Sequence, residues 1–401
     1  MNSRERFLAT MNFERPDRNL FWEFAYWAGT VRRWYNEGLP CKFGIPSRED
    51  VSGGQTVLQV QEEIPDGRGI FHSGLMGFWW SPFDQDVMAC LGMEKGPRQQ
   101  PVNYWLCPRF EERILEDHGH WYLWTDAEGC LKRELKDRST IPQVLSWPVS
   151  NREDWERIKA ERLRPTLEGR LPENWPQMIQ ELKARDYPLI IGSNNGFYGT
   201  PRKLLGPENV LYTFYDDPGL IKDINAYLVD FWIALYDQVL DQIDADCALI
   251  WEDMCYKAGP LISPAMFREF LLPNYKKLTS FLHDRGVKIV LVDTDGDCRK
   301  LLPLFIEGGV TGLFPFEVTA GMNIVEVRKS FPRLQIIGGL DKTKVAAGRQ
   351  AIDEELEAKV PFMLEQGGYI ASLDHGVPPD ISWENFVYYR TRLQEMILAA
   401  A

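Results

Sequence analysis

Short apolar runs alternate with longer amphipathic segments through the second half of the chain. Strand-like runs fall near 188–193, 247–252, 287–293, 312–317, 334–339 and 369–373. Helix-like segments fall at 218–243, 264–285, 298–307, 323–331, 351–366 and 383–399. This alternation is typical of an α/β fold in which helices cross over between parallel strands. Six units plus earlier strands favour a closed (β/α)8 TIM barrel, although periodicity alone does not exclude an open sheet.

The first half of the chain has a weaker pattern. Ser3 is expected to cap a short helix, and residues 19–27 are typical of a first strand. Residues 45–110 are rich in glycine, proline and aromatic residues. Their weak periodicity predicts no arrangement of helices and strands. Residues 118–137 predict an inserted β-hairpin that turns at 126–129. We therefore expect a single domain over residues 1–401, a TIM barrel with N-terminal insertions that include this hairpin.

Carboxylates end the apolar runs of the second half. They are Glu252 and Asp253, Asp293 and Asp295, Glu317, Asp341, and Asp374, which precedes His375. A buried parallel strand is almost wholly apolar, so a charge at its carboxyl end lies on the rim of the sheet. Active sites of TIM barrels form at that rim. The pattern therefore predicts one acidic site that contains a single histidine.

Composition narrows the class of function. The net charge of −13 argues against binding to nucleic acid or to a membrane surface. No run approaches the roughly 18 apolar residues of a membrane-spanning helix, and the N-terminus has no apolar signal segment. The seven cysteines include no CxxC pair, which indicates a reducing compartment and no zinc site made of thiolates. We expect a cytoplasmic protein.

Asp293 and Asp295 are the strongest candidates for metal ligands. Residues two apart at the end of a strand point to the same side, so the two carboxylates can converge. With His375 they could hold Zn²⁺ or another divalent ion with open positions. The same three side chains could instead form a metal-free acid/base set. A structural alternative is a loop whose aspartates cap the next helix, for which Asp297 is the better candidate.

Other strand ends offer supporting residues. The loop 192–196 contains Asn194 and Asn195 and would suit a ligand that approaches the backbone closely. Asp253 is a candidate to hold substrate. Lys342 could anchor an acidic substrate group or pair with Asp341 or another neighbour.

Several motifs together resemble the uroporphyrinogen decarboxylase superfamily, which includes cobalamin-dependent methyltransferases. They are Ser3-Arg-Glu-Arg-Phe-Leu, Pro16-Asp17-Arg18, Leu261-Ile-Ser-Pro264, Phe270-Leu-Leu-Pro273, Asp295-Gly296, Gly338-Gly339, His375-Gly-Val-Pro378 and Trp383-Glu-Asn385. The resemblance covers nearly the whole chain and implies a (β/α)8 barrel. Each motif is weak when taken singly.

The resemblance also separates two branches. Decarboxylases carry Arg-Gln-Ala-Gly-Arg after the first strand, whereas the matching stretch here is Tyr26-Trp-Ala-Gly-Thr30, without either arginine. Aromatic residues take their place, which implies a smaller and less acidic ligand, with Trp22, Tyr26 and Trp27 as substrate-binding residues.

In the methyltransferase branch, zinc is held by His-x-Cys-Gly and a later Cys-Gly. These positions fall on Asp293-x-Asp295-Gly296 and His375-Gly376. Carboxylates are harder ligands than thiolates and suit activation of oxygen or nitrogen. The resemblance thus implies methyl transfer from a small O- or N-methylated substrate, such as an aromatic methoxy compound, to the Co(I) corrinoid of a partner protein. Zinc is the expected metal, and Glu252, Glu317, Asp341 and His375 are the expected catalytic residues.

Two alternatives stay open. One is a metal-free lyase similar to uroporphyrinogen decarboxylase, acting on another carboxylated substrate. The other is a non-catalytic barrel, which the density of strand-end acids argues against, since buried unpaired charge is costly. The sequence does not identify the methyl donor, and it does not decide whether the chain forms a homo-oligomer.

Overall fold

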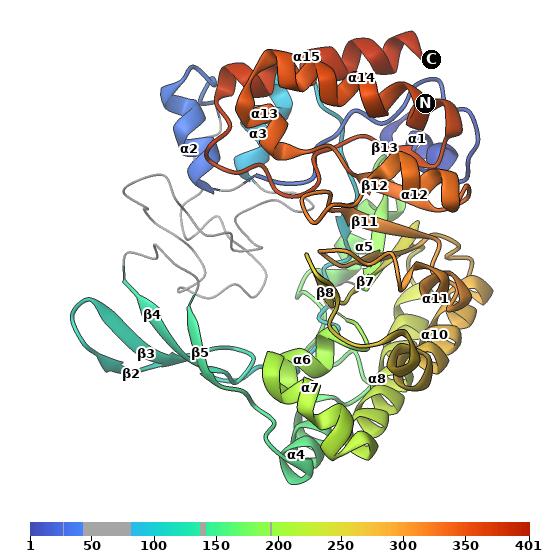
Figure 1. The fold of residues 1–401 in the computed structure, drawn as a ribbon. Helices are drawn as coiled ribbons and strands as arrows, with labels where there is room; N and C mark the ends of the chain where they lie inside the picture. The colour runs from blue at the N-terminus through green and yellow to red at the C-terminus, as the bar shows by residue number, and fades with distance from the viewer. Residues whose placement is uncertain (27, 43–81, 137–141, 193–194) are drawn as a thin grey trace.

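The computed structural model describes residues 1–26, 28–42, 82–136, 142–192 and 195–401. Its body is an α/β fold built on a seven-stranded parallel sheet in the order β1-β6-β7-β10-β11-β12-β13 (Figure 1). The strands are β1 (Arg98–Gln99), β6 (Leu189–Gly192), β7 (Cys247–Trp251), β10 (Val290–Asp293), β11 (Gly312–Phe316), β12 (Gln335–Gly338) and β13 (Tyr369–Ile370). The six strands expected in the second half are all confirmed, and β1 is an additional strand from the stretch 45–110.

Helices connect the strands as expected. The expected segments correspond to α8 (Pro218–Leu240), α9 (Pro264–Met266), α10 (Leu272–Asp284), α11 (Leu302–Glu307), α12 (Ile324–Ser330), α14 (Arg349–Gln366) and α15 (Trp383–Ala399). Helix α13 (Lys342–Ala347) is an additional one. Others are α1 (Ser3–Met11), α2 (Ala28–Asn36), α3 (Pro82–Leu91), α4 (Arg152–Arg162), α5 (Trp175–Lys183), α6 (Gly199–Leu205) and α7 (Pro207–Asp216). The side chains of Ser263 and Asp217 cap α9 and α8. Helix α1 begins one residue earlier than expected, because Asn2 and Glu5 form its capping box.

The sheet separates two apolar layers. Cys247 and Leu249 of β7 belong to an inner cluster that also contains Leu291 of β10 and Phe314 of β11. Their neighbours Ala248 and Ile250 belong to the larger cluster under the helices. Because successive side chains of a strand point to opposite faces, this alternation means that the sheet curls around the inner cluster. The curl is compatible with a TIM barrel, but a closed barrel is not shown, because the sheet of the described residues has seven hydrogen-bonded strands.

The described part of the expected first strand (19–27), residues 19–26, lies between the segment that leads into β1 and the segment that follows β13. The Phe21 carbonyl accepts a hydrogen bond from the Glu94 backbone N–H (2.8 Å), and the Ala25 carbonyl accepts one from Val377 N–H (2.8 Å). Only an isolated bridge between Tyr26 and Val377 forms, so the predicted strand is wrong as a regular ladder. The buried Glu23 carboxylate replaces part of that ladder, because it accepts the Leu373 N–H at 2.9 Å.

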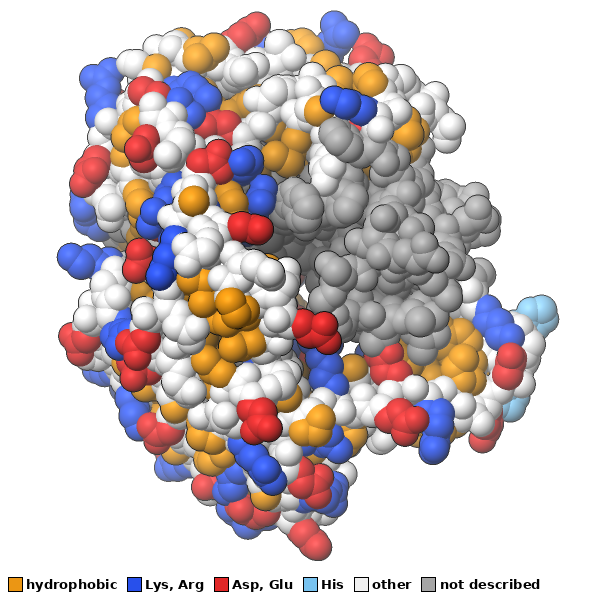
Figure 2. Space-filling model, turned by 180° about the vertical axis from the view of Figure 1, so that it is seen from behind, with side chains coloured by type: hydrophobic (Ala, Val, Ile, Leu, Met, Phe, Trp, Pro, Cys, Tyr) orange, Lys and Arg blue, Asp and Glu red, His pale blue; other side chains and the backbone are white. Residues whose placement is uncertain are grey.

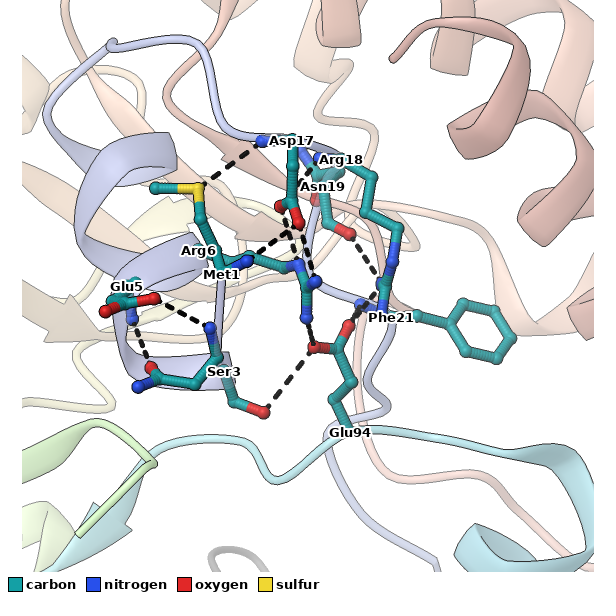
Figure 3. A network of polar contacts seen from close by, with 10 residues as sticks. Met1, Ser3, Glu5, Arg6, Asp17, Arg18, Asn19, Phe21 and Glu94 are labelled. Atoms are coloured by element: carbon teal, nitrogen blue, oxygen red, sulfur yellow. Dashed lines mark hydrogen bonds and ion pairs between the residues drawn. The ribbon is translucent and has the colours of Figure 1, made fainter.

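A polar network fixes the start of this segment (Figure 3). Glu94 accepts hydrogen bonds from Arg6 (2.6 Å), Arg18 (2.5 Å) and the backbone N–H of Phe21 (2.9 Å). Arg6 also pairs with Asp17, which lies in the turn after α1. The network therefore ties α1, the turn and the entry to β1 together.

A four-stranded antiparallel sheet projects from the body, and we call it the arm (Figure 1). Its strands are β2 (Arg113–Asp117), β3 (Trp121–Thr125), β4 (Leu131–Leu135) and β5 (Gln143–Ser146). The predicted hairpin is confirmed as β3–β4, and Asp126 fixes its turn by accepting the N–H groups of Glu128 and Cys130. Strands β2 and β5 extend it on either side. None of the described helices has the length and apolarity needed to cross a membrane.

Candidate functional site

Asp295 lies two residues beyond the end of β10, next to His375. The distance from Asp295 Oδ2 to His375 Nε2 is 4.0 Å. The other oxygen, Oδ1, is buried without a hydrogen-bond partner among the described residues. Burial, reinforced by the nearby Glu317, raises the pKa of Asp295 to about 7. Near neutral pH this carboxyl group therefore exchanges a proton readily.

Asp293, the last residue of β10, lies beside Asp295. Burial and then the charges of Asp295 and Asp253 raise the pKa of Asp293 well above its usual range. The negative charge of Asp295 is thus one cause of the raised pKa of Asp293. A proton or another cation at this point would offset that charge.

His375 is held neutral. Its ring packs edge-on against Phe24, with centroids 5.7 Å apart. Burial lowers the pKa of His375 to about 4, and the positive charge of Lys342 contributes to the decrease. At neutral pH the imidazole can accept a hydrogen bond or bind a metal, but it is not a cation.

Glu317, after β11, supports the turn that carries Asp295. Its carboxylate accepts the Gly296 N–H at 2.7 Å and the Thr319 hydroxyl at 2.6 Å. Gly296 has a φ of +80°, and a Cβ there would collide with the backbone of Tyr256. The turn thus requires glycine at this position.

Lys342 forms an ion pair with Asp374 and not with Asp341. Its Nζ lies 3.1 and 3.2 Å from the two oxygens of Asp374, whose side chain is fully buried. Asp341 instead caps α13, where it accepts the backbone N–H of Thr343 at 2.8 Å. The pairing of Lys342 with Asp374 is a feature of the site that sequence reasoning missed.

Glu252 is turned toward the helices. Its carboxylate accepts backbone N–H groups from Phe197, Tyr198 and Gly199 and a hydrogen bond from the Tyr275 hydroxyl. It is fully buried, and burial raises its pKa. Since four donors already occupy it, Glu252 fixes the loop that begins α6.

Asp253 carries backbone strain. Its φ of +45° is rare for a residue with a side chain. Arg202 of α6 pairs with its carboxylate and also donates to its carbonyl oxygen at 2.9 Å. Strained residues of this kind concentrate at functional sites, which supports a role for Asp253.

Three of the predicted substrate-binding residues are buried in the protein. Trp22 is buried in the inner cluster, and Tyr26 is buried in the outer one against Trp34 and Phe386. Asn195 is also buried and donates to the Tyr236 hydroxyl at 2.9 Å. All three side chains pack against protein groups. Trp27 and Asn194 lie outside the described residues.

The charged groups at the rim influence one another. The pKa of Asp295 responds to Glu317, Asp253, Lys342 and Asp374, and that of His375 responds to Lys342, Glu317 and Asp253. We call this set, together with Asp293, the rim cluster. It brings together most of the acids predicted from the strand ends, while Asp341 is used as a helix cap and Glu252 as a loop support.

The rim cluster has the donor chemistry of a divalent-metal site. Two carboxylates and a neutral imidazole are hard or intermediate ligands, and the buried Oδ1 of Asp295 needs a partner. Over the described ranges, however, no group of three His, Cys, Asp or Glu residues is arranged to hold a metal ion. Asp293, Asp295 and His375 would have to move closer together to bind one.

The fold and rim cluster define an α/β protein with an acidic site at the carboxyl ends of its parallel strands. Residues 132–395 match the family model described as uroporphyrinogen decarboxylase (URO-D), which is more than half of the chain. The chain belongs to this family, whose members are enzymes that include decarboxylases and methyltransferases. No curated protein matches the sequence.

Proposed function

We propose that this chain is a methyltransferase that moves a methyl group from a small O- or N-methylated molecule to the Co(I) corrinoid of a partner protein. The observation that carries the proposal is the pairing of Asp295, whose pKa is about 7, with the neutral His375 at 4.0 Å. Demethylation leaves an electron pair on the substrate oxygen or nitrogen. A proton supplied at that atom makes the departing group a weaker base and lowers the barrier.

Each residue of the rim cluster has a role in this scheme. The bond between the methyl carbon and the heteroatom breaks as the methyl group passes to the corrinoid, and the bonding electrons stay on the heteroatom. Protonated Asp295 gives its proton to that atom. His375, which has the lower pKa, stays neutral and leaves the proton on Asp295 until the transfer. Glu317 holds the Asp295 turn, and Asp253 contacts the substrate.

A divalent metal fits the same place in chemical terms. Asp293, Asp295 and His375 would bind it, and the ion would supply Lewis-acid activation of the heteroatom. Asp295 and His375 are deprotonated in that state. The proton and the metal are therefore alternative occupants of one site.

The second candidate is a metal-free lyase. The raised pKa of Asp293 favours it, because a protonated carboxyl group can protonate the carbon from which carbon dioxide leaves. Anaerobic incubation with cob(I)alamin and methoxyaromatic or methylated amine donors separates the two candidates. Formation of methylcob(III)alamin supports methyl transfer, whereas release of carbon dioxide from uroporphyrinogen without it supports the lyase.

A further inference from the structure

Trp251 is an aromatic residue at the rim to which the proposed reaction gives no role. It is the last residue of β7 and pairs in register with Asp293, the last residue of β10. Leu249 and Leu291, two residues before each of them, lie in the inner cluster. Because side chains alternate along a strand, Trp251 and Asp293 leave the sheet on that same inner side, about 5 Å apart. The indole side chain therefore lies next to the rim cluster, at the mouth of the curled sheet.

Trp251 is not packed as a core residue, although it is large and apolar. It belongs to neither of the two apolar clusters of the described residues, and it is only partly buried. Its ring lies against Gly199 of α6, where a Cβ would come within 2.7 Å of the Trp251 Cε3. A partly uncovered aromatic surface beside reactive carboxyl groups is typical of a binding site, and it suits a ligand with a ring of its own.

Two basic side chains of α6 lie over the same indole. The Nζ of Lys203 is 4.6 Å from the ring centroid, and the guanidinium of Arg202 is 5.8 Å from it. Arg202 is already occupied, because it pairs with the Asp253 carboxylate and donates to the carbonyl oxygen of the same residue. Lys203 faces Glu128 of the neighbouring arm (Figure 1), but their closest charged atoms are 3.9 Å apart, beyond hydrogen-bond distance. The Lys203 ammonium can therefore bind an anionic group of a ligand.

These charges favour an anion over a cation as the ligand beside Trp251. Two cations already lie over its ring, and a methylated amine, which is itself positively charged at neutral pH, would be repelled by them. On the described part of the face in Figure 2, basic side chains are interspersed with acidic ones and form no broad basic surface. A carboxylate is therefore recognised by an individual side chain such as Lys203 and not by the general charge of the protein, which is −13.

We propose that Trp251 and Lys203 select a methoxylated aromatic carboxylate as the methyl donor. The aromatic ring stacks on Trp251, the carboxylate pairs with Lys203, and the methoxy oxygen faces Asp293 and Asp295 of the rim cluster. This inference rests on the proposed methyl transfer, and it chooses the aryl ether among the O- and N-methylated donors. Trp251 and Lys203 determine specificity, and they take no part in breaking the bond between the methyl carbon and the oxygen.

Isothermal titration calorimetry on the full chain, without corrinoid, tests the inference separately from methyl transfer. The probes are the methoxybenzoate isomers, methoxybenzene, which lacks the carboxylate, 4-methoxycyclohexanecarboxylate, which lacks the aromatic ring, and trimethylamine. The best methoxybenzoate should bind about tenfold more tightly than each of the other probes, because it alone uses both the indole and the ammonium. Equal binding of methoxybenzoate and either analogue overturns the inference, as does tighter binding of trimethylamine or the absence of methoxybenzoate binding.

Variants test the two contacts one at a time. W251L should weaken methoxybenzoate binding about tenfold and leave binding of the saturated acid unchanged, because only the aromatic contact is lost. K203M should remove the preference for methoxybenzoate over methoxybenzene, because no ammonium is left to pair with the carboxylate. W251F and K203R keep the ring and the charge and should retain both preferences.

K159M is the matched control. Lys159 also lies over a tryptophan, Trp155, at 5.6 Å, and its side chain is 20% exposed against 19% for Lys203. K159M should bind like wild type, and a W251L or K203M variant that does the same overturns the inference. Circular dichroism checks that each variant is folded. Methyl transfer from a non-aromatic donor by a chain that binds no methoxybenzoate would contradict this inference alone, whereas selective methoxybenzoate binding without methyl transfer would contradict the proposed function.

Discussion

Asp295 and His375 face each other at 4.0 Å across the rim of the sheet, from the ends of two different strands. The carboxyl group has a pKa of about 7, and the imidazole has a pKa of about 4. Between these values the acid holds the proton and the histidine is neutral. This order is the reverse of the usual one for the two residue types, and it is what makes Asp295 a proton donor in the proposed reaction.

The pH dependence of activity follows from this order. If protonated Asp295 is the donor, the catalytic rate falls as the pH rises through about 7 and should decrease about tenfold per pH unit above it. In D295N the rate should drop about 100-fold and lose this dependence. The matched exposed variant D230N should behave as wild type. A rate that stays constant from pH 6 to pH 9 would rule out the donor role.

The same carboxyl group affects stability. Its pKa is raised on folding from the ordinary value of 3.8, so the folded state binds more protons and loses stability as the pH rises from about 4 to about 7. D295N removes that penalty. After allowance for the partial exposure of the side chain, we expect a gain of about 1–2 kcal/mol at pH 8 and none at pH 4. Urea unfolding at the two pH values measures this difference, and an equal effect at both would contradict it.

Removing one member of the Lys342–Asp374 ion pair should destabilise the protein. K342M leaves the buried Asp374 carboxylate without its cation, and the expected loss is about 3 kcal/mol in the free energy of unfolding. The double variant K342M/D374N should recover part of the loss, because no buried charge remains. K344M, an exposed position on the same helix, is the control. A K342M variant as stable as K344M would show that the pair contributes little.

Glu252 should matter for stability and not for proton transfer. Its carboxylate accepts three backbone N–H groups and the Tyr275 hydroxyl, whereas glutamine would turn an N–H group toward those donors. We expect E252Q to lose about 3 kcal/mol of stability. The pH profile of any remaining activity should match that of wild type. A shifted profile with unchanged stability would assign Glu252 to the chemistry instead.

Gly296 offers a paired test of the turn that carries Asp295. G296A places a methyl group against the Tyr256 backbone at a φ of +80°, whereas Gly286 has a similar φ of +85° and open space around it. G286A should therefore cost only the conformational strain, about 1 kcal/mol, and G296A at least twice as much. Thermal unfolding compares them directly. Equal losses would mean that the turn has room to adjust.

The positions of the strands in the second half were predictable, because each buried parallel strand is a short apolar run bounded by polar residues. The caps at Ser263 and Asp217 were predictable for a similar local reason. The roles of individual acids were harder to assign. Ala248, Ile250 and Glu252 are each two residues apart, so their side chains lie on the same face of the strand. Since Ala248 and Ile250 face the helices, the sequence already indicated that Glu252 points away from the rim.

Long-range partners were not predictable from sequence. Lys342 is adjacent to Asp341 in the chain, but its ion pair is with Asp374, 32 residues away, because the local helix start uses Asp341 as a cap. Trp22 and Tyr26 were expected to bind substrate, yet tertiary packing buries both rings. The very short strand β1 gave no periodic signal.

Methyl transfer itself is the central claim, and a labelled donor tests it most directly. The purified chain is incubated anaerobically with cob(I)alamin and ¹³C-methoxy or ¹³C-methylamine donors, and the product is identified by mass spectrometry and ¹³C NMR. The account predicts ¹³C-methylcob(III)alamin, formed by wild type and about 100-fold more slowly by D295N. Absence of labelled methylcobalamin with every donor, together with carbon dioxide release from a carboxylated substrate, would contradict it.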